Sequence, residues 1–277
     1  MNSINEFNRF SSGLRENGYV MPVLFVGHGS PMNGIEDNQF SQGWRKIASE
    51  IPKPNAVLVV SAHWLSNGTR ITAMDFPPTI HDFGGFPQAL FEVQYPAPGS
   101  PEIAMETAAL LKTFHAEPDH DWGLDHGAWT VVRHMYPDAD IPVLQLSIDY
   151  NKGPQYHYDL AKELYSLRKK GILIMGSGNM VHNLRMVAWN KLNEPEYGYD
   201  WAFELNDKFK NLIASGNHQD LIHFSRISSN INLAIPTSEH YLPLIYTIGL
   251  QSDKEDVMFF NDKAVGGSLT MTSVKFG

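Results

Sequence analysis

The sequence predicts an α/β fold with a mixed, mostly parallel central sheet flanked by helices. Short apolar runs recur along the 277-residue chain, and helical patterns with recognisable starts lie between them. Apolar runs without clear alternation are typical of parallel strands, because crossover helices cover both faces of a parallel sheet. The chain contains no internal repeat and no low-complexity tract. We therefore expect a single domain over residues 1–277, with residues 1–19 as an N-terminal extension or helix.

Six runs are predicted to be strands. Four of them are nearly continuous in apolar residues and are expected to be buried: residues 20–27, 56–62, 141–148 and 172–176. Two further runs, residues 257–260 and 268–274, are predicted as closing strands. The second alternates between apolar and polar residues, which favours a place at a sheet edge.

Helices are predicted between these strands. Ser100 offers an N-cap to the first of them, and Pro101 suits its first turn. Apolar residues behind this start, from Ile103 to Phe114, fall on one helical face. Residues 156–170 and 200–215 are further predicted helices.

A long loop is predicted over residues 75–99, which are rich in proline, glycine and aromatic residues and lack a clear period. A loop of this length in a compact domain is often functional.

Charge and residue usage exclude several classes of protein. The formal charge is −9 and the isoelectric point is near 5.7, so the chain repels a phosphate backbone and nucleic acid is not expected as a partner. No window holds the ~18 consecutive apolar residues that a membrane span needs. The first residues are polar where a signal peptide is apolar. Without cysteine, any metal site uses nitrogen and oxygen ligands. We expect a cytoplasmic enzyme, and nothing in the sequence indicates an oligomeric state.

Three of the 12 histidines follow predicted parallel strands. His28 comes after MPVLFV, His63 after AVLVVS and His182 after ILIMGSG. The carboxyl ends of parallel strands border the crevice in which open α/β sheets bind ligands. His240, in TSEHYLP, lies at the expected start of a helix and is within reach of the same crevice.

One histidine beside a strand is more often a hydrogen-bonded structural residue than a ligand. The same placement three times favours a shared metal or catalytic site. Glycines beside His28 and before His182 indicate a close backbone approach to a bound group. Six other histidines are interpreted as surface or capping residues: His115, His120, His134, His157, His218 and His223.

Two more histidines lie in aromatic surroundings. His126, in the LDHGAW segment, is expected in a loop between Trp122 and Trp129, and His81 belongs to the TIHDFGGFP part of the long loop. Most aromatic residues near these histidines are expected in the core, but some, such as Trp64, would form walls of a small-molecule pocket.

Six motifs occur here in the order seen in the class III extradiol dioxygenases: GHGSP, SAHW, TIHDFGGFP, LDHGAW, MGSGNMVHNLR and SEHYLP. The chain resembles this family from about Met21 to the C-terminus, and most closely the branch that contains the 4,5-DOPA extradiol dioxygenases. The resemblance implies one catalytic domain of the extradiol dioxygenase type.

The resemblance also implies roles for the histidines. His28, His63 and His240 match metal ligands, and His182 matches an acid/base residue that also coordinates when zinc is bound. His126 matches a second catalytic histidine near the substrate hydroxyl. The wider family has a glutamate as third ligand where this chain has His240, and Glu239 is adjacent.

The implied activity is insertion of O2 into a catechol ring to give a ring-opened semialdehyde, with Fe(II) as the working metal. Zn(II) suits the same nitrogen ligands, so the isolated protein is expected to carry zinc in an inactive form. The residues expected to contact a DOPA-like catechol are Ser30, Trp64, His81 and Arg185. Arg70 is the alternative to Arg185 for a substrate carboxylate.

Two other functions remain open at this point. A zinc-dependent hydrolase or a tetrapyrrole metal chelatase also places HGS after a strand, but leaves His126 and His182 without a role. A non-enzymatic metal-binding protein of the same fold has no need of all five site histidines.

Overall fold

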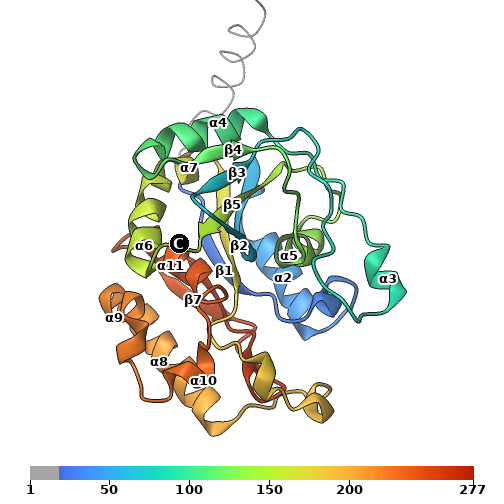
Figure 1. Ribbon diagram of the computed structural model, residues 1–277, viewed down its shortest axis with the longest axis vertical. Coiled ribbons are helices and arrows are strands. Elements are labelled where there is room, and N and C mark those ends of the chain that lie inside the picture. The colour runs from blue at the N-terminus through green and yellow to red at the C-terminus, as the bar shows by residue number, and fades with distance from the viewer. Residues whose placement is uncertain (1–18) are drawn as a thin grey trace, which may run out of the picture.

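The computed structural model describes residues 19–277 (Figure 1), so the predicted extension or helix over residues 1–19 lies outside the described residues except for Tyr19. Within them, an eight-stranded sheet has the order β4-β3-β5-β2-β6-β1-β10-β7. The bounds of its strands are β1 Val23–Gly27, β2 Ala56–Ser66, β3 Arg70–Thr72, β4 Glu117–Asp119, β5 Val143–Asp149, β6 Ile172–Gly178, β7 Val257–Phe260 and β10 Ser273–Phe276. The predicted fold class is confirmed.

The central strands β5, β2, β6 and β1 are parallel neighbours, while β10 runs antiparallel to both β1 and β7. The prediction that residues 268–274 form an edge strand is wrong. The strand begins at Ser273 and lies inside the sheet, and β7 forms the edge. Its alternation does not reflect solvent exposure, because Ser273, Val274 and Phe276 are all buried. Residues just before it form a separate ribbon, β8 (Ala264–Val265) with β9 (Leu269–Thr270).

Helices cover both faces of the sheet (Figure 1). One face packs against α2 (Gln39–Glu50) and α5 (His126–Met135). The other packs against α4 Pro101–Leu110, α6 Pro154–Glu163, α7 Tyr165–Lys169, α8 Asp200–Ala214 and α11 Leu242–Gly249. Shorter helices are α3 Gln88–Phe91, α9 His218–Ile222 and α10 Ile231–Ala234. Successive strand residues therefore enter two cores, as Leu24 and Phe25 do, which explains the continuous apolar runs.

The helix predictions hold with two corrections. The helix predicted to continue to Phe114 ends at Leu110, and Lys112–Phe114 form a separate 3-10 turn. Ser100 caps α4 by accepting a hydrogen bond from the Ile103 amide, and residues 200–215 form α8. Residues 156–170 were expected to form one helix, but the chain divides into α6 and α7 at Leu164. There the Leu164 amide donates to the Ala161 carbonyl, three residues back, so the turn tightens and the helix ends.

The predicted loop over residues 75–99 is irregular apart from α3. Among residues 19–277, no helix is both long enough and apolar enough to cross a membrane.

Three of the six histidines interpreted as surface or capping residues, His115, His120 and His223, are exposed. The interpretation is wrong for His157, which is fully buried between α6 and α11, with its Nδ1 atom 2.9 Å from the Tyr246 hydroxyl. His134 is half-buried and contacts Arg45 and the Asn33 carbonyl.

Burial of His157 makes the stability of the protein depend on pH. Burial lowers the pKa of His157 from the ordinary 6.5 to about 4, so on acidification the unfolded chain binds this proton first. The stabilisation is complete above about pH 6.5 and is lost as the pH falls toward 4. Between pH 7 and pH 5, we expect the free energy of unfolding of the native protein to fall by about 2 kcal/mol more than that of the His157→Asn variant. Urea unfolding of both proteins at both pH values measures this, and equal losses would contradict it.

Candidate metal centre

Three of the histidines lie at or near the carboxyl ends of parallel strands. His28 directly follows β1, and His182 lies beyond the end of β6. His63 was expected just after its strand but lies within β2, which continues to Ser66. The pairing of β2 with β5 shifts register between Val60 and Leu65, so His63 sits in an irregular part of the strand. Such irregularities bend a strand and change the direction of a side chain.

The other two histidines, His126 and His240, lie at the starts of helices. His240 lies just before α11, as expected. His126 was expected in a loop but is the first residue of α5, because the Asp125 carboxylate caps this helix by accepting from the Ala128 amide. Asp125 is fully buried, and it also accepts from Ser61 and Gln145 at 2.6 and 2.7 Å. Burial raises the pKa of Asp125. These hydrogen bonds of the Asp125 carboxylate fix the start of α5 and therefore the position of His126.

The glycines beside these histidines serve chain packing. A Cβ on Gly178 would lie 2.1 Å from the carbonyl oxygen of His240, and one on Gly27 would lie 2.6 Å from that of Met271. The Asn179 amide donates to the same His240 carbonyl at 2.9 Å. The expected approach of these glycines to a bound group is therefore corrected. Gly178 lets the segment of His240 approach the end of β6, and Gly27 lets Met271 approach the end of β1.

Five imidazole rings lie together at the carboxyl ends of β1, β2 and β6. The ring centroids of His28, His63 and His240 are 5.0–5.4 Å apart in pairs. The His126 ring lies 3.8 Å from that of His63, and the His182 ring is stacked on that of His240 at 3.5 Å. Residues far apart in the sequence therefore form one cluster.

Oxygen atoms outside the cluster fix the orientation of four rings. The Ser177 hydroxyl donates to the Gly127 carbonyl at 2.5 Å, so its oxygen accepts from Nδ1 of His28 at 3.0 Å. Asp82 accepts from Nδ1 of His126 at 3.0 Å and lies 3.3 Å from Nδ1 of His63. Glu239 lies 3.4 Å from Nδ1 of His240. With hydrogens on these Nδ1 atoms, the Nε2 atoms carry lone pairs.

The inner atoms fit a divalent metal. The Nε2 atoms of His28 and His63 are 3.1 Å apart. Two lone pairs facing each other repel unless a cation lies between them, and two nitrogens bonded to one metal at ~2.0–2.1 Å lie ~2.9–3.4 Å apart. Ligand atoms of His28, His63 and His126 lie within 4.8 Å of one another. The cluster therefore has the donor type and the spacing that a metal ion requires.

The electrostatics keep these histidines neutral. Burial, followed by the neighbouring histidines, holds the pKa of His28 and His240 well below the usual range. Burial, followed by His126, lowers the pKa of His63 to about 3, and burial lowers that of His182 to about 4. Protons therefore do not compete with a metal for these nitrogens near pH 7.

Asp82 is a site residue that the sequence analysis missed. It lies in the TIHDFGGFP segment next to His81, and its side chain is 18% exposed. Burial alone would raise its pKa, but the hydrogen bonds and charge of His126 and the charge of His63 hold the pKa below its usual value. The only sequence feature that pointed to Asp82 is its place in the long aromatic loop, which was predicted to be functional.

The residues expected at the substrate occupy different surroundings. Ser30 is exposed, and its hydroxyl accepts from the Met32 amide at the start of a helical turn. Trp64 is buried and stacked on Trp122 with 5.7 Å between centroids. His81 lies 3.0 Å from the Val93 carbonyl through its Nε2 atom, within the loop. Arg185 is exposed and lines a cavity of about 210 Å³ together with His182 and Glu239.

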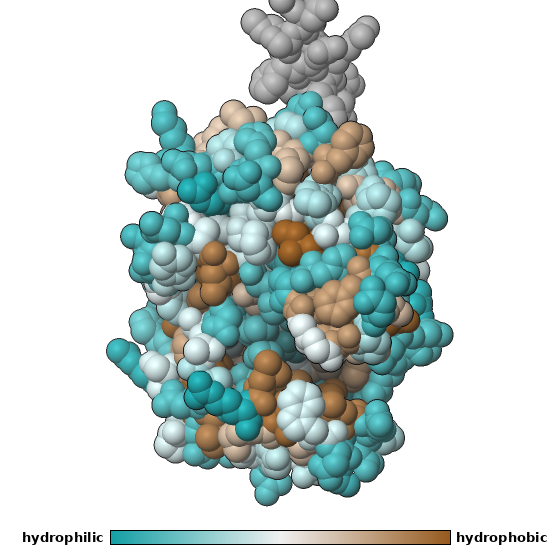
Figure 2. All heavy atoms as spheres, turned by 45° about the vertical axis from the view of Figure 1, so that its right-hand side comes forward, coloured by the Kyte–Doolittle hydropathy of each residue, from teal (hydrophilic) through white to brown (hydrophobic). Residues whose placement is uncertain are grey.

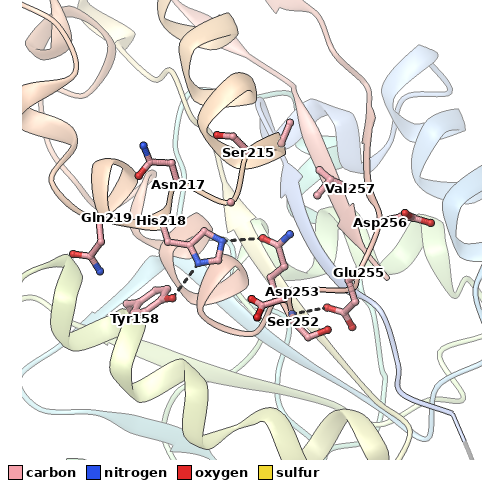
Figure 3. A pocket seen from close by; sticks show the side chains of 13 residues that line it. Tyr158, Ser215, Asn217, His218, Gln219, Ser252, Asp253, Glu255, Asp256 and Val257 are labelled. Carbon is pink, nitrogen blue, oxygen red and sulfur yellow. Dashed lines mark hydrogen bonds between the residues drawn. The ribbon is translucent and has the colours of Figure 1, made fainter.

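A larger cavity of about 760 Å³ lies away from this cluster, between α6, α9 and the start of β7 (Figure 3). His218 is at its centre, and its two ring nitrogens contact Tyr158 and Gln251 at 3.0 and 2.9 Å. Both nitrogens are therefore satisfied within the protein, and the cavity adds no ligand to the metal centre.

The chain matches known proteins over most of its length. Residues 22–272 match the family described as the catalytic LigB subunit of aromatic ring-opening dioxygenase. A 4,5-DOPA dioxygenase extradiol of Escherichia coli (strain K12) is 46% identical over 93% of this chain and 95% of its own length. A Beta vulgaris protein of the same name is 34% identical over 93% and 97%. The crystal structure of an uncharacterized Escherichia coli K12 protein superposes with a TM-score of 0.80 at 40% identity, covering 93% of this chain and all of the other.

Proposed function

Because the chain belongs to the family of the catalytic LigB subunit of aromatic ring-opening dioxygenase, we propose that it is an Fe(II)-dependent extradiol dioxygenase acting on a catechol. The reaction adds both atoms of O2 to the ring and yields a ring-opened semialdehyde. The observation that carries this proposal is the cluster of inward-facing histidine nitrogens, with 3.1 Å between the Nε2 atoms of His28 and His63. The active unit in this proposal is one catalytic domain.

We assign the metal to His28, His63 and His240, with His182 as a further ligand when zinc is bound. The position of Glu239 at the outer nitrogen of His240 supports the histidine as ligand and the glutamate as its hydrogen-bond partner. Bound Fe(II) would bring catechol and O2 together and supply the electron transfer that zinc does not provide.

The proton transfers belong to the remaining side chains. His126 takes a proton from a catechol hydroxyl at Nε2, and Asp82 stabilises the resulting imidazolium through Nδ1. His182 borders the small cavity beside the cluster, so it is the second group able to hold or return a proton at the substrate. A residue in such an acid/base role typically contributes ~10²–10⁴-fold in rate.

The cavity next to His182 suits the side chain of a DOPA-like catechol. Arg185 offers a guanidinium for a carboxylate, whereas Arg70 lies within 4 Å of Glu117 and Asp119. Leu184, which lines the cavity, is 56% exposed, and Trp189, four residues after Arg185, is 69% exposed. Figure 2 shows apolar side chains in separate groups on the face that it draws, one of them in the lower part of the molecule. Apolar surface next to one cation suits an aromatic ring with an anionic tail.

Ser30 and His81 are proposed as further residues near the substrate. Ser30 is exposed two residues after His28, and His81 contacts the Val93 carbonyl within the loop that carries Asp82. Trp64 is buried, so its contribution is to support His63 in β2.

Metal exchange tests the proposed function. We expect chelation to abolish the aerobic yellowing of a catechol, and Fe(II) to restore it where Zn(II) does not, because zinc cannot transfer an electron to O2. The measurement is the visible absorbance of the product after reconstitution with each metal. Full activity in a zinc-loaded, iron-free sample would overturn the assignment as an Fe(II)-dependent dioxygenase.

A further inference from the structure

We infer that Asp82 is a positioning residue that orients two imidazoles of different function, the metal ligand His63 and the acid/base residue His126. The division of roles between these histidines rests on the proposed function, but the contacts of Asp82 do not.

Asp82 accepts two hydrogen bonds from His126. Its Oδ1 atom accepts from the His126 amide at 2.9 Å, and its Oδ2 atom accepts from Nδ1 of the same residue at 3.0 Å. The Oδ2 atom also lies 3.3 Å from Nδ1 of His63. One carboxylate therefore faces the outer nitrogens of two rings whose centroids are 3.8 Å apart.

The long loop holds Asp82 in this place without help from its carboxylate. The Leu124 amide donates to the Pro78 carbonyl at 2.8 Å, and the Ile80 amide donates to the Leu124 carbonyl at 2.7 Å. Trp129 adds a hydrogen bond from its ring to the Ile80 carbonyl at 2.9 Å. The loop is thus paired with the residues directly before His126, which sets the distance between Asp82 and the histidines.

An amide cannot replace this carboxylate. Two oxygens without hydrogens accept from the amide and from Nδ1 of His126 and face Nδ1 of His63 at 3.3 Å, whereas asparagine presents an NH2 group on one side. With one acceptor lost, a ring turns over or changes tautomer, and its Nε2 lone pair no longer faces the centre. The negative charge also stabilises a cation at the cluster.

The test compares Asp82→Asn with Asp75→Asn, an exposed aspartate of the same loop. Zn(II) and Fe(II) affinities are measured by chelator competition. We expect Asp82→Asn to weaken binding of both metals by ~10–100-fold and Asp75→Asn to leave it unchanged. Equal affinities in the two variants would overturn the inference. If Asp82→Asn does not fold by circular dichroism, Asp82→Glu, which moves the charge by one methylene, must still weaken metal binding.

A double-variant cycle separates the two histidines. In the His126→Ala background, Asp82→Asn should still weaken metal binding through His63 but should lower kcat no further. An unchanged effect on kcat would mean that Asp82 does not act through His126. If the native protein binds metal tightly and Asp82→Asn weakens binding, but no catechol is cleaved, the proposed function fails and the orientation of His63 by Asp82 stands.

Discussion

Replacing His28 with alanine is expected to remove metal and catechol cleavage together. His28 is 1% exposed, its Nδ1 atom is held by Ser177, and its Nε2 atom lies 3.1 Å from that of His63. We expect metal content to fall below about one-tenth of the native value and turnover to fall to background. Elemental analysis and catechol turnover measure the two effects.

A matched control is His115→Ala, which removes an exposed histidine. It should retain native metal content and native turnover. If His28→Ala retained its metal, the assignment of His28 as a ligand would be wrong, whatever happened to the activity.

Replacing His126 with alanine is expected to separate metal binding from turnover. The Asp82 carboxylate orients this ring and stabilises its protonated form, as an acid/base residue requires. We expect His126→Ala to keep near-native metal content and to lose ~10²–10⁴-fold in turnover. Metal analysis with single-turnover kinetics measures both. His182→Ala is the companion variant: we expect it to bind Fe(II) more weakly, to bind catechol still, and to turn over very slowly.

The outcome for His126 also decides between two sets of ligands. Its ligand atom lies within 4.8 Å of those of His28 and His63, so these three histidines form an alternative metal site. If His126→Ala lost its metal as completely as His28→Ala, His126 would be a ligand. His182, stacked on His240, would then be the main acid/base residue.

Local sequence signals were sufficient for four strands, because β1, β2, β5 and β6 are nearly continuous apolar runs that are buried on both faces. The short strands β3 and β4 were not predicted, because neither forms a long apolar run. Local signals also predicted where His28 and His182 lie, since both follow apolar runs. Local sequence signals were insufficient to predict features that depend on tertiary contacts. The inner position of β10 depends on its pairing with β1 and β7, and the irregularity at His63 depends on the pairing of β2 with β5.

The outer partners of the histidines could not be predicted for the same reason. Ser177 is 149 residues from His28, and Asp82 is 44 residues from His126. A serine or an aspartate has no periodicity that marks it as a partner, and only the folded chain brings the pairs together. The same holds for Asp125, whose capping of α5 makes His126 a helix residue rather than a loop residue.

The most direct test of the central claim is the mass of the product formed by the iron-loaded protein from catechol under 18O2. We predict a ring-opened product heavier than catechol by one molecule of O2, with label in its carboxylate, because a dioxygenase places both oxygen atoms in the substrate. A quinone without added oxygen, or a product labelled only from water, would contradict extradiol cleavage even if the histidine cluster bound iron as proposed.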